Sequence, residues 1–368
     1  MKRLITSSLT FLLCLHFYTM FAQPSGWREM NILSRGGKID EIRESPVRSI
    51  GFIDDSTFCS THQNGCMVIY RIDYGIMDKA LIVKVIKQKS IPDLDTQPNS
   101  VILSPDGKYL VSGCWITWDD VNVSGSTPKH NIYIYDVQNM QIPSMSTWDA
   151  ESRNPDRTIT IDEGVMSPSQ LQFSPDGTKL LANSGYNIFI IDFATGKILD
   201  NITAFETTSY SASFYGDGDM VAYGDGKLVK IYSLADKKIT HTLTGHKDEV
   251  LCVYGYKTDR DNLFTSDFKM SMISWNVNSE SMRCSKPIKM KIPPYKMKYN
   301  PGDNRVYIGG AGSGMFLMHP DYFSFEPRTA YESTSNTGYP QIFDFNRSNT
   351  AYIQSVEGGE YITVNVKE

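Results

Sequence analysis

The stretch FSPDGTKLLAN at residues 173–183 decides the fold, because a near copy, LSPDGKYLVSG, occurs at residues 103–113. In Ser-Pro-Asp-Gly the proline fixes a turn dihedral, the aspartate side chain hydrogen-bonds the neighbouring backbone, and the glycine accepts a positive φ. The same turn recurs along the chain in varied chemical form. We therefore interpret Asp176 as a turn residue and not as a catalytic one.

Seven copies of this pattern follow one another along the chain. Each has an aromatic residue or leucine at the end of an apolar run, then turn-forming residues, then a second alternating run, which predicts strand, turn and strand. From the third copy onward the starts are 41, 42, 43 and 46 residues apart, a period typical of four-stranded propeller blades. The sequence predicts an all-β fold, a seven-bladed β-propeller of four-stranded antiparallel blades. The copies begin at Phe52, Leu103, Phe173, Phe214, Tyr256, Tyr299 and Phe345.

The seventh copy contains only three strand-like runs, QIFDF, TAYIQ and YITVNV, before the chain ends at Glu368. We expect the missing outer strand to be EMNIL at residues 29–33, brought in from the N-terminal side to close the ring. Closure hides two sheet edges that would otherwise template aggregation. Truncation at either end should therefore destabilise the whole domain.

The segments HTLTGHKDEVLCVYGY and LFTSDFKMSMISWNV resemble a WD repeat. In that family a His of a Gly-His pair, a Ser or Thr on the second strand, an Asp in the following turn and a Trp on the third strand form a hydrogen-bonded structural tetrad. His246, Thr265 and Trp275 match this pattern. Lys269 occupies the Asp position six residues before the Trp, and Asn276 replaces the usual Asp after it. The resemblance therefore implies an incomplete tetrad.

The resemblance is one of pattern over about residues 45–368, and only this unit is close to the family consensus. Divergent propellers of secreted bacterial proteins, including lactonase-like and quinoprotein-like ones, stay open as relatives. WD-repeat propellers mostly act as rigid platforms for partners. The resemblance implies that role here, although a fold alone does not fix a function.

The N-terminal segment has the order of a secretory signal. Residues 1–22 begin with Met1-Lys2-Arg3, continue with an apolar run and end with small residues before Gln23. We predict a signal peptide over 1–22, cleaved after Ala22, and a single propeller domain over 23–368. Leu13 before Cys14 disfavours a lipid anchor, which requires a small residue there. The expected location is the periplasm or cell surface of a Gram-negative bacterium.

The composition is globular, with 40% hydrophobic and 12% aromatic residues in 368 positions. The net charge is -5, and it becomes -7 once Lys2 and Arg3 are removed with the signal. An acidic protein is a poor electrostatic match to nucleic acid and to anionic membranes. We predict no nucleic-acid partner and no membrane insertion after signal cleavage.

No motif has the specificity of a catalytic or cofactor site. Gly309 to Gly314 lack the dinucleotide-binding spacing and a following helix, so a hairpin loop is favoured. His241 and His246 lack partners at a zinc-binding spacing. No Gly-x-Ser-x-Gly elbow is present either. We predict no catalytic residue, no metal and no cofactor.

Cys59 and Cys66 flank the Asn64-Gly65 turn and resemble a disulfide pair. If those two turn residues form the whole loop, Cys59 faces Tyr70, four residues along the sheet from Cys66. A disulfide requires α-carbons within about 7 Å. We therefore expect both thiols to stay reduced and buried.

The second blade carries extra chain, since 70 residues separate Leu103 from Phe173. We assign the excess to insertions at 114–130, between the second and third strands, and at 146–165, between this blade and the next. Both should rise from the same rim. Long loops on rigid scaffolds often carry function. These two insertions contain three tryptophans and several acids, of which we single out Trp115, Trp118, Asp119, Asp120, Trp148 and Asp149.

Two roles stay open for these residues. The tryptophans either fix the insertions onto the rim or form a platform for a ligand, because burial of each ring is worth a few kcal/mol. A surface of tryptophan and carboxylate suits stacking on a sugar or holding a basic peptide. We take these six residues as ligand-binding candidates.

The leading hypothesis is a non-catalytic binding or scaffolding platform of the bacterial envelope, with a protein or glycan partner. The alternative is a propeller hydrolase or lactonase-like enzyme with an acidic site at the channel mouth. That alternative requires acids or histidines from several blades to converge near the axis. A third hypothesis, a structural module in an envelope assembly, requires a broad apolar patch.

Overall fold

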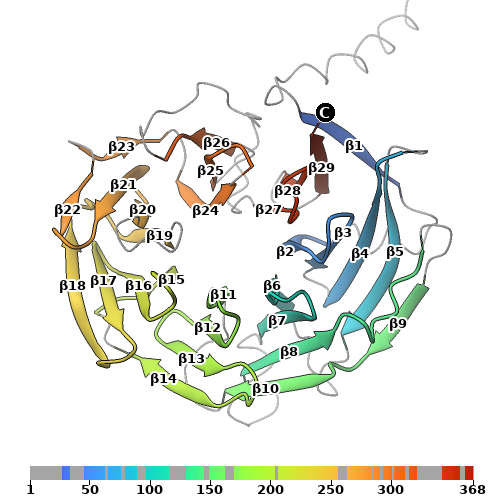
Figure 1. Ribbon diagram of the computed structural model, residues 1–368, viewed down its shortest axis with the longest axis horizontal. Helices are drawn as coiled ribbons and strands as arrows, with labels where there is room; N and C mark the ends of the chain where they lie inside the picture. Colours follow the sequence, from blue (N-terminus) through green and yellow to red (C-terminus); the bar gives the residue numbers. More distant parts are fainter. Residues whose placement is uncertain are drawn as a thin grey trace, which may run out of the picture.

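Seven blades of β-sheet surround a central axis (Figure 1). Within the described part of the chain, the regular secondary structure consists of strands β1 to β29. The predicted seven-bladed propeller is confirmed. The structure, a computed structural model, describes residues 27–33, 45–62, 65–75, 79–88, 97–115, 130–144, 149–161, 170–203, 206–255, 263–283, 286–290, 293–300, 302–310, 315–320, 342–356 and 361–367. No helix in these segments is long and apolar enough to cross a membrane.

The first four blades follow one another in chain order. Blade 1 contains β2 (Val47–Phe52), β3 (Thr57–His62), β4 (Cys66–Asp73) and β5 (Lys79–Gln88). Blade 2 contains β6 (Gln97–Leu103), β7 (Tyr109–Trp115), β8 (His130–Asp136) and β10 (Arg157–Ile161). Blade 3 contains β11 (Gln170–Phe173), β12 (Lys179–Asn183), β13 (Ile188–Asp192) and β14 (Ile198–Ile202). Blade 4 contains β15 (Ala212–Tyr215), β16 (Met220–Asp225), β17 (Leu228–Ser233) and β18 (Lys238–Thr244).

The last three blades complete the ring. Blade 5 contains β19 (Val250–Gly255), β20 (Leu263–Asp267) and β21 (Ser271–Asn276), with an outer edge formed by β22 (Ser281–Met282) and β23 (Ile288–Lys289). The described strands of blade 6 are β24 (Pro294–Asn300), β25 (Arg305–Gly310) and β26 (Met315–Met318). Blade 7 contains β27 (Phe343–Phe345), β28 (Ala351–Val356), β29 (Tyr361–Lys367) and β1 (Trp27–Leu33).

Strand β1 closes the ring, as the sequence predicts. Its first half pairs antiparallel with β29, from Trp27 opposite Lys367 to Met30 opposite Val364. Its second half pairs parallel with β5 of blade 1, so β1 joins the last blade to the first (Figure 1). The side chain of Met30 is 2% exposed. Both chain ends are thereby held at one seam of the ring.

The outer edge of β5 is covered along its length. Strand β1 pairs with its residues 79–81, and β9 (Asp149–Arg153) pairs in parallel with its residues 84–88. An uncovered outer strand would expose a row of backbone N–H and C=O groups to other chains. The seam between blades 1 and 7 is therefore protected from edge pairing.

The segment 146–165 differs from its interpretation as an insertion between blades. It contains β9 and also β10, which pairs with β8 as the outer strand of blade 2, with Ile159 opposite Ile132. The segment RTITI at residues 157–161 was not predicted to be that outer strand, although its isoleucines at every second position suit one buried face. Most of the excess assigned to 146–165 therefore belongs to the connection between the third and fourth strands of blade 2. In the antiparallel order of the blade, this connection lies on the face opposite the connection between the second and third strands.

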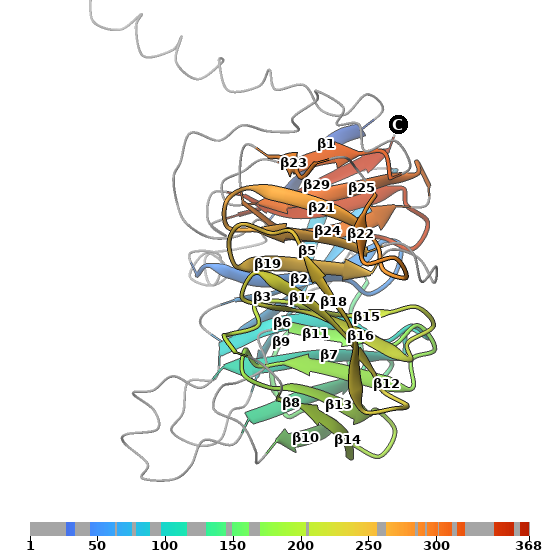
Figure 2. The ribbon, with the colours of Figure 1, turned by 90° about the vertical axis from the view of Figure 1, so that its left-hand side faces the viewer.

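Two faces of the ring follow from the antiparallel order of the strands. We call the side with the loops between second and third strands, and between consecutive blades, the upper face. The opposite side, with the turns between first and second strands, is the lower face. Figure 2 shows the strands of successive blades running along the short axis, from one face to the other.

The Ser-Pro-Asp-Gly turns lie on the lower face and are held by their own side chains. Ser174 Oγ donates to Asp176 Oδ1 at 2.6 Å, and Thr178 N donates to the same oxygen at 3.0 Å. Gly177 has a φ of +73°, a conformation that favours glycine. The hydrogen bonds from Ser174 and Thr178 lower the pKa of Asp176 to about 2. The predicted turn role of Asp176 is confirmed.

Hydrophobic cores lie between blades, where the face of one sheet packs on the next. One core joins Val111 and Ile134 of blade 2 to Leu180 and Phe189 of blade 3. Another joins Ile231 of blade 4 to the third strand of blade 5. A single four-stranded sheet cannot bury both faces alone, so each blade depends on its neighbours.

The hairpin of β3 and β4 has a register one residue away from the expected one. Cys59 pairs with Ile69, not with Tyr70, because the connection between His62 and Cys66 contains three residues. Gly65 takes a φ of +80°, as three-residue hairpin loops require at this position. Cys59 and Cys66 are nevertheless free and buried, as expected.

Candidate functional site

The first strands of the blades line a cavity of about 850 Å³ along the axis. We call it the channel, and we call strands β2, β6, β11, β15, β19, β24 and β27 the inner strands, because they lie nearest the centre in Figure 1. An inner strand has one edge without a neighbouring strand. Its backbone N–H groups on that edge therefore need other acceptors.

Side chains from one blade accept hydrogen bonds from the inner strand of the next. Gln172 Oε1 accepts the N–H of Phe214 at 2.7 Å, and Asp344 Oδ2 accepts the N–H of Phe52 at 2.9 Å. Such contacts stabilise five junctions between blades, so much of the polar lining is structural. The other pairs, acceptor first, are Ser49 and Val101, Gln170 and Ala212, Ser211 and Val253, Ser213 and Gly255, and Tyr254 and Tyr299.

Two lysines and one aspartate form a charged cluster in the channel. Lys296 and Lys298 are two residues apart on β24, so their side chains lie on the same face of the strand. Lys298 Nζ forms an ion pair with Asp344 Oδ1. Burial opposes ionisation of Asp344, but the charges of Lys298 and Lys296 hold its pKa below the usual value. Asp344 therefore stays a carboxylate that is already bound on both oxygens.

Lys296 differs from Lys298 in the groups that it contacts. Its Nζ lies 5.6 Å from the centroid of the Phe343 ring, and none of the ion pairs between described residues includes it. Burial, together with the positive charge of Lys298, lowers the pKa of Lys296 to about 8, although Asp344 opposes this shift. Its ammonium group lines the channel beside an aromatic ring, with no carboxylate of its own.

Aromatic side chains surround the upper mouth of the channel. Tyr210 and Phe268 come from two upper-face loops, and their rings meet edge to face with centroids 5.1 Å apart. Both line the cavity, as does Tyr295 at the start of β24. Tyr210 is nevertheless 44% exposed. Partial burial, followed by the charge and hydrogen bond of Glu249, raises the pKa of Tyr210.

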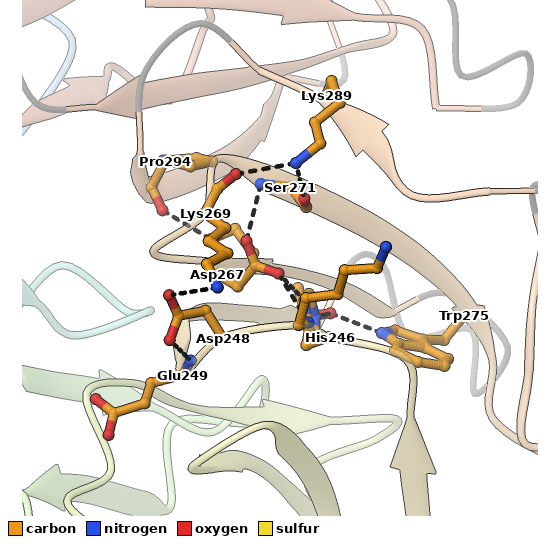
Figure 3. Close-up of polar contacts among 12 residues, drawn as sticks. His246, Asp248, Glu249, Asp267, Lys269, Ser271, Trp275, Lys289 and Pro294 are labelled. Atoms are coloured by element: carbon orange, nitrogen blue, oxygen red, sulfur yellow. Dashed lines mark hydrogen bonds and ion pairs between the residues drawn. The ribbon is translucent and has the colours of Figure 1, made fainter.

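The predicted tetrad residues of blade 5 are in contact (Figure 3). Thr265 Oγ1 lies 2.6 Å from His246 Nε2 and accepts the indole N–H of Trp275, also at 2.6 Å. Thr265 and Trp275 have no exposed surface, and His246 is 7% exposed. These three residues therefore join an inter-blade loop to the second and third strands, as the family resemblance implies.

The tetrad is complete, contrary to the expectation that Lys269 had replaced its aspartate. Asp267 Oδ2 lies 3.0 Å from His246 Nδ1, and Asp267 Oδ1 accepts the N–H of Ser271 at 2.9 Å. Figure 3 shows the Asp267 carboxylate between these two groups. Lys269 is exposed and lies 3.9 Å from Asp248. The prediction placed the acid six residues before Trp275. In the structure the acid is two residues after Thr265, at the end of β20.

Blade 1 contains a related network with a different order of residues. Ser60 and Tyr70 are ten residues apart on the second and third strands, as are Thr265 and Trp275. Ser60 Oγ lies 3.2 Å from Tyr70 OH and 2.7 Å from His62 Nε2. The imidazole therefore comes from the end of the second strand, where blade 5 has its aspartate. Nothing in the sequence of this blade resembles the family consensus, which is why the network was not predicted.

His62 anchors that network to the chain that enters blade 1. Its Nδ1 lies 2.9 Å from the carbonyl oxygen of Ser45. The carbonyl accepts a hydrogen bond from the N–H at Nδ1, so Nε2 of the neutral ring accepts the hydrogen bond of the Ser60 hydroxyl. Burial lowers the pKa of His62, although the Ser45 carbonyl opposes this shift.

The six ligand-binding candidates chosen from the sequence are not tested by these contacts. Trp118, Asp119, Asp120 and Trp148 lie outside the described residues. For Trp115 and Asp149 the backbone alone is described: Trp115 ends β7 at the upper face, and Asp149 begins β9 at the outer edge of blade 1. The predicted signal peptide at residues 1–22 also lies outside the described residues.

Metal-binding side chains do not cluster in the described part of the chain, where no group of three or more His, Cys, Asp or Glu residues is placed to hold an ion. The carboxylates that line the channel there are Asp54 and Asp344, and no histidine lines it. The convergence of acids or histidines required by the enzyme alternative is therefore not found among these residues.

Comparison with solved structures places this arrangement among known propellers. The WD40 beta propeller domain of Doa1 superimposes with a TM-score of 0.65, covering 88% of this chain and 94% of that one at 13% sequence identity. The chain therefore has a β-propeller fold similar to that of a WD40 propeller domain. No protein-family profile matches its sequence, and no curated protein matches it. At this identity the similarity shows the fold alone.

Several residues that line the channel were not predicted from the sequence. The sequence nevertheless contained a signal that depends on position within each copy. The residues one and three places before the first residue of a copy lie on an inner strand or directly before it. In copies three, four and six these positions hold Gln172 and Gln170, Ser213 and Ser211, and Lys298 and Lys296. Their polarity beside apolar anchors marks them as channel residues once the ring is assumed.

Proposed function

We propose that this protein is an exported, non-catalytic platform that binds a protein partner at the upper mouth of its channel. The observation that carries the proposal is the position of its exposed apolar side chains. Tyr186, Tyr210 and Met270 are 49%, 44% and 39% exposed, and all three lie on upper-face loops of blades 3 to 5. Tyr210 contacts Phe268, which shares a turn with Met270. Isolated exposed apolar residues need no explanation, but Tyr210 and Phe268 line the cavity mouth, and the other two of the three exposed residues lie on the same face.

A protein partner suits the chemistry of this mouth. Tyrosine, phenylalanine and methionine are enriched in protein interfaces. The aromatic rings supply large contact area at a low cost in conformational entropy. The inter-blade hydrogen bonds of the inner strands keep the mouth in one arrangement before binding. A preorganised surface loses less entropy on association than a flexible one.

The channel supports binding more than hydrolysis. A hydrolase of the expected kind needs a carboxylate or histidine free to activate water. Asp344 instead binds Lys298 with one oxygen and the N–H of Phe52 with the other. Export to the envelope rests on the signal-like residues 1–22 and is part of the proposal.

Site-specific photo-crosslinking tests this function. A photoreactive phenylalanine analogue at Tyr210 is expected to give a discrete protein adduct in cells, whereas the analogue at Leu199 is not. Leu199 is a matched control because it is 41% exposed but lies on the outer strand of blade 3. Equal adducts at both sites would contradict a specific mouth interface. An adduct that shifts on glycosidase treatment would indicate a glycan partner instead.

The tryptophan candidates give a second test, because Trp115 ends β7 on the same face as Tyr210. If the 114–130 segment contributes to the platform, replacing Trp115 and Trp118 with alanine should abolish binding and leave the melting temperature unchanged. Loss of folding with unchanged affinity would show that these rings only fix the segment to the rim.

A further inference from the structure

The channel contains an excess of positive charge in an acidic protein. Among the described residues, those that line the channel and carry charge are four cations and two carboxylates, whereas the whole chain has a net charge of -5. A concave, low-dielectric site of one sign concentrates ions of the opposite sign. The four cations are Arg48, Lys296, Lys298 and Arg347, and the carboxylates are Asp54 and Asp344.

Lys296 is the cation best placed to meet a ligand. It lies two residues nearer the start of β24 than Lys298, so it is about 7 Å nearer the upper mouth. Lys298 is neutralised by Asp344, whereas Lys296 takes part in no ion pair between described residues and lies over the face of the Phe343 ring. Lys296 is partly buried. An anion bound in the channel would offset the cost of holding this charge away from water.

The shape of the channel favours entry of a side chain from above. A cavity of about 850 Å³ is in the size range of ligand sites. At the lower end, Arg347 Nη2 reaches across from blade 7 to the carbonyl oxygen of Pro105 in blade 2, at 3.4 Å. At the upper end, Tyr210 and Tyr295 lead from the exposed mouth toward Lys296.

We propose that Lys296 binds the carboxylate of an aspartate or glutamate side chain, which a protein partner inserts into the upper mouth of the channel. This inference rests on the proposed function, because it names the group of the partner that the mouth receives. The aromatic rim would contact the flanking residues of the partner, and the ammonium of Lys296 would select for the acid. An amide in place of the acid could accept a hydrogen bond but would leave the charge unpaired.

Peptide selection on the purified protein tests the inference. Phage-displayed random 12-residue peptides are selected for binding, and the selected sequences are expected to share an Asp or Glu at one position. A synthetic peptide with that acid changed to its amide should bind about 10- to 100-fold more weakly, the loss expected for one charge-assisted hydrogen bond. The Lys296→Met variant should show the same loss for the acidic peptide. Combining both changes should cost little more than either alone.

Two further variants keep the result interpretable. Lys296→Arg should retain most of the affinity, because it restores the positive charge. Tyr210→Ser should weaken every selected peptide through the rim, whether or not the peptide carries an acid. The thermal unfolding temperature of Lys296→Met is expected to match or exceed that of the wild type, since a partly buried charge without an ion-pair partner among the described residues is removed.

The outcomes separate this inference from the proposed function. Peptides that lose affinity on Tyr210→Ser but not on Lys296→Met would overturn the role of the lysine and leave the platform in place. Selected peptides without a shared acid would do the same. Selection of no peptide that depends on Tyr210 would overturn both.

Discussion

Replacing Asp267 with alanine is expected to destabilise the propeller strongly. The side chain has no exposed surface, and its oxygens accept the N–H of Ser271 at 2.9 Å and bind His246 Nδ1 at 3.0 Å. The backbone N–H of Lys247 is a third donor, at 3.4 Å. Removing one partner of a buried charged network typically costs about 3–5 kcal/mol. For a domain of about 340 residues that loss lowers the melting temperature by about 4–7 °C.

The matched control is Lys269→Ala, two residues along the same turn. Its side chain is 61% exposed and lies 3.9 Å from Asp248, so the change should alter the free energy of unfolding by less than about 0.5 kcal/mol. Urea unfolding followed by tryptophan fluorescence measures both variants. Equal effects for Asp267 and Lys269 would refute the assignment of Asp267 as the fourth tetrad residue.

Three other perturbations have defined outcomes. A β-carbon added to Gly255 would lie 2.6 Å from the carbonyl oxygen of Phe214, whereas one added to Gly51 would have no neighbour closer than 3.6 Å. Gly255→Ala should therefore lower the midpoint of urea unfolding, and the matched control Gly51→Ala should not. Burial holds the pKa of His62 in the folded protein below its ordinary value of 6.5, so the unfolded chain binds the proton first as the pH falls. Stability should therefore fall as the pH drops below about 6.5, and His62→Gln should flatten this slope. An unchanged slope in the variant would contradict this reasoning. Deleting residues 27–33 should lower the urea midpoint and cause aggregation detectable by light scattering, and an unaltered midpoint would contradict the closing role of β1.

Local turn chemistry made the architecture predictable. Asp176 and its neighbours form their hydrogen bonds within five residues, so the pattern is visible in sequence and repeats once per blade. The closing strand was predictable for a different reason, since the seventh copy lacks one strand and EMNIL has a strand-like pattern. Both inferences depend on spacing alone.

Features that depend on the closed ring were harder to predict. Lys298 and Asp344 are 46 residues apart and meet only because blades 6 and 7 are neighbours. Asp267 was missed because the family spacing was counted from Trp275, although the acid is fixed by the end of the second strand. A shift of one residue at the β3–β4 turn likewise changed which residue faces Cys59.

The closing strand also sets the order of events during synthesis. Strand β1 precedes every blade in the sequence, yet its antiparallel partner β29 belongs to the seventh blade. During vectorial synthesis or export the edge of β1 that pairs with β29 must therefore stay unpaired until the seventh blade has been made. A chain that stops before β29 cannot close its ring, so the seventh blade decides whether the first six become a stable domain.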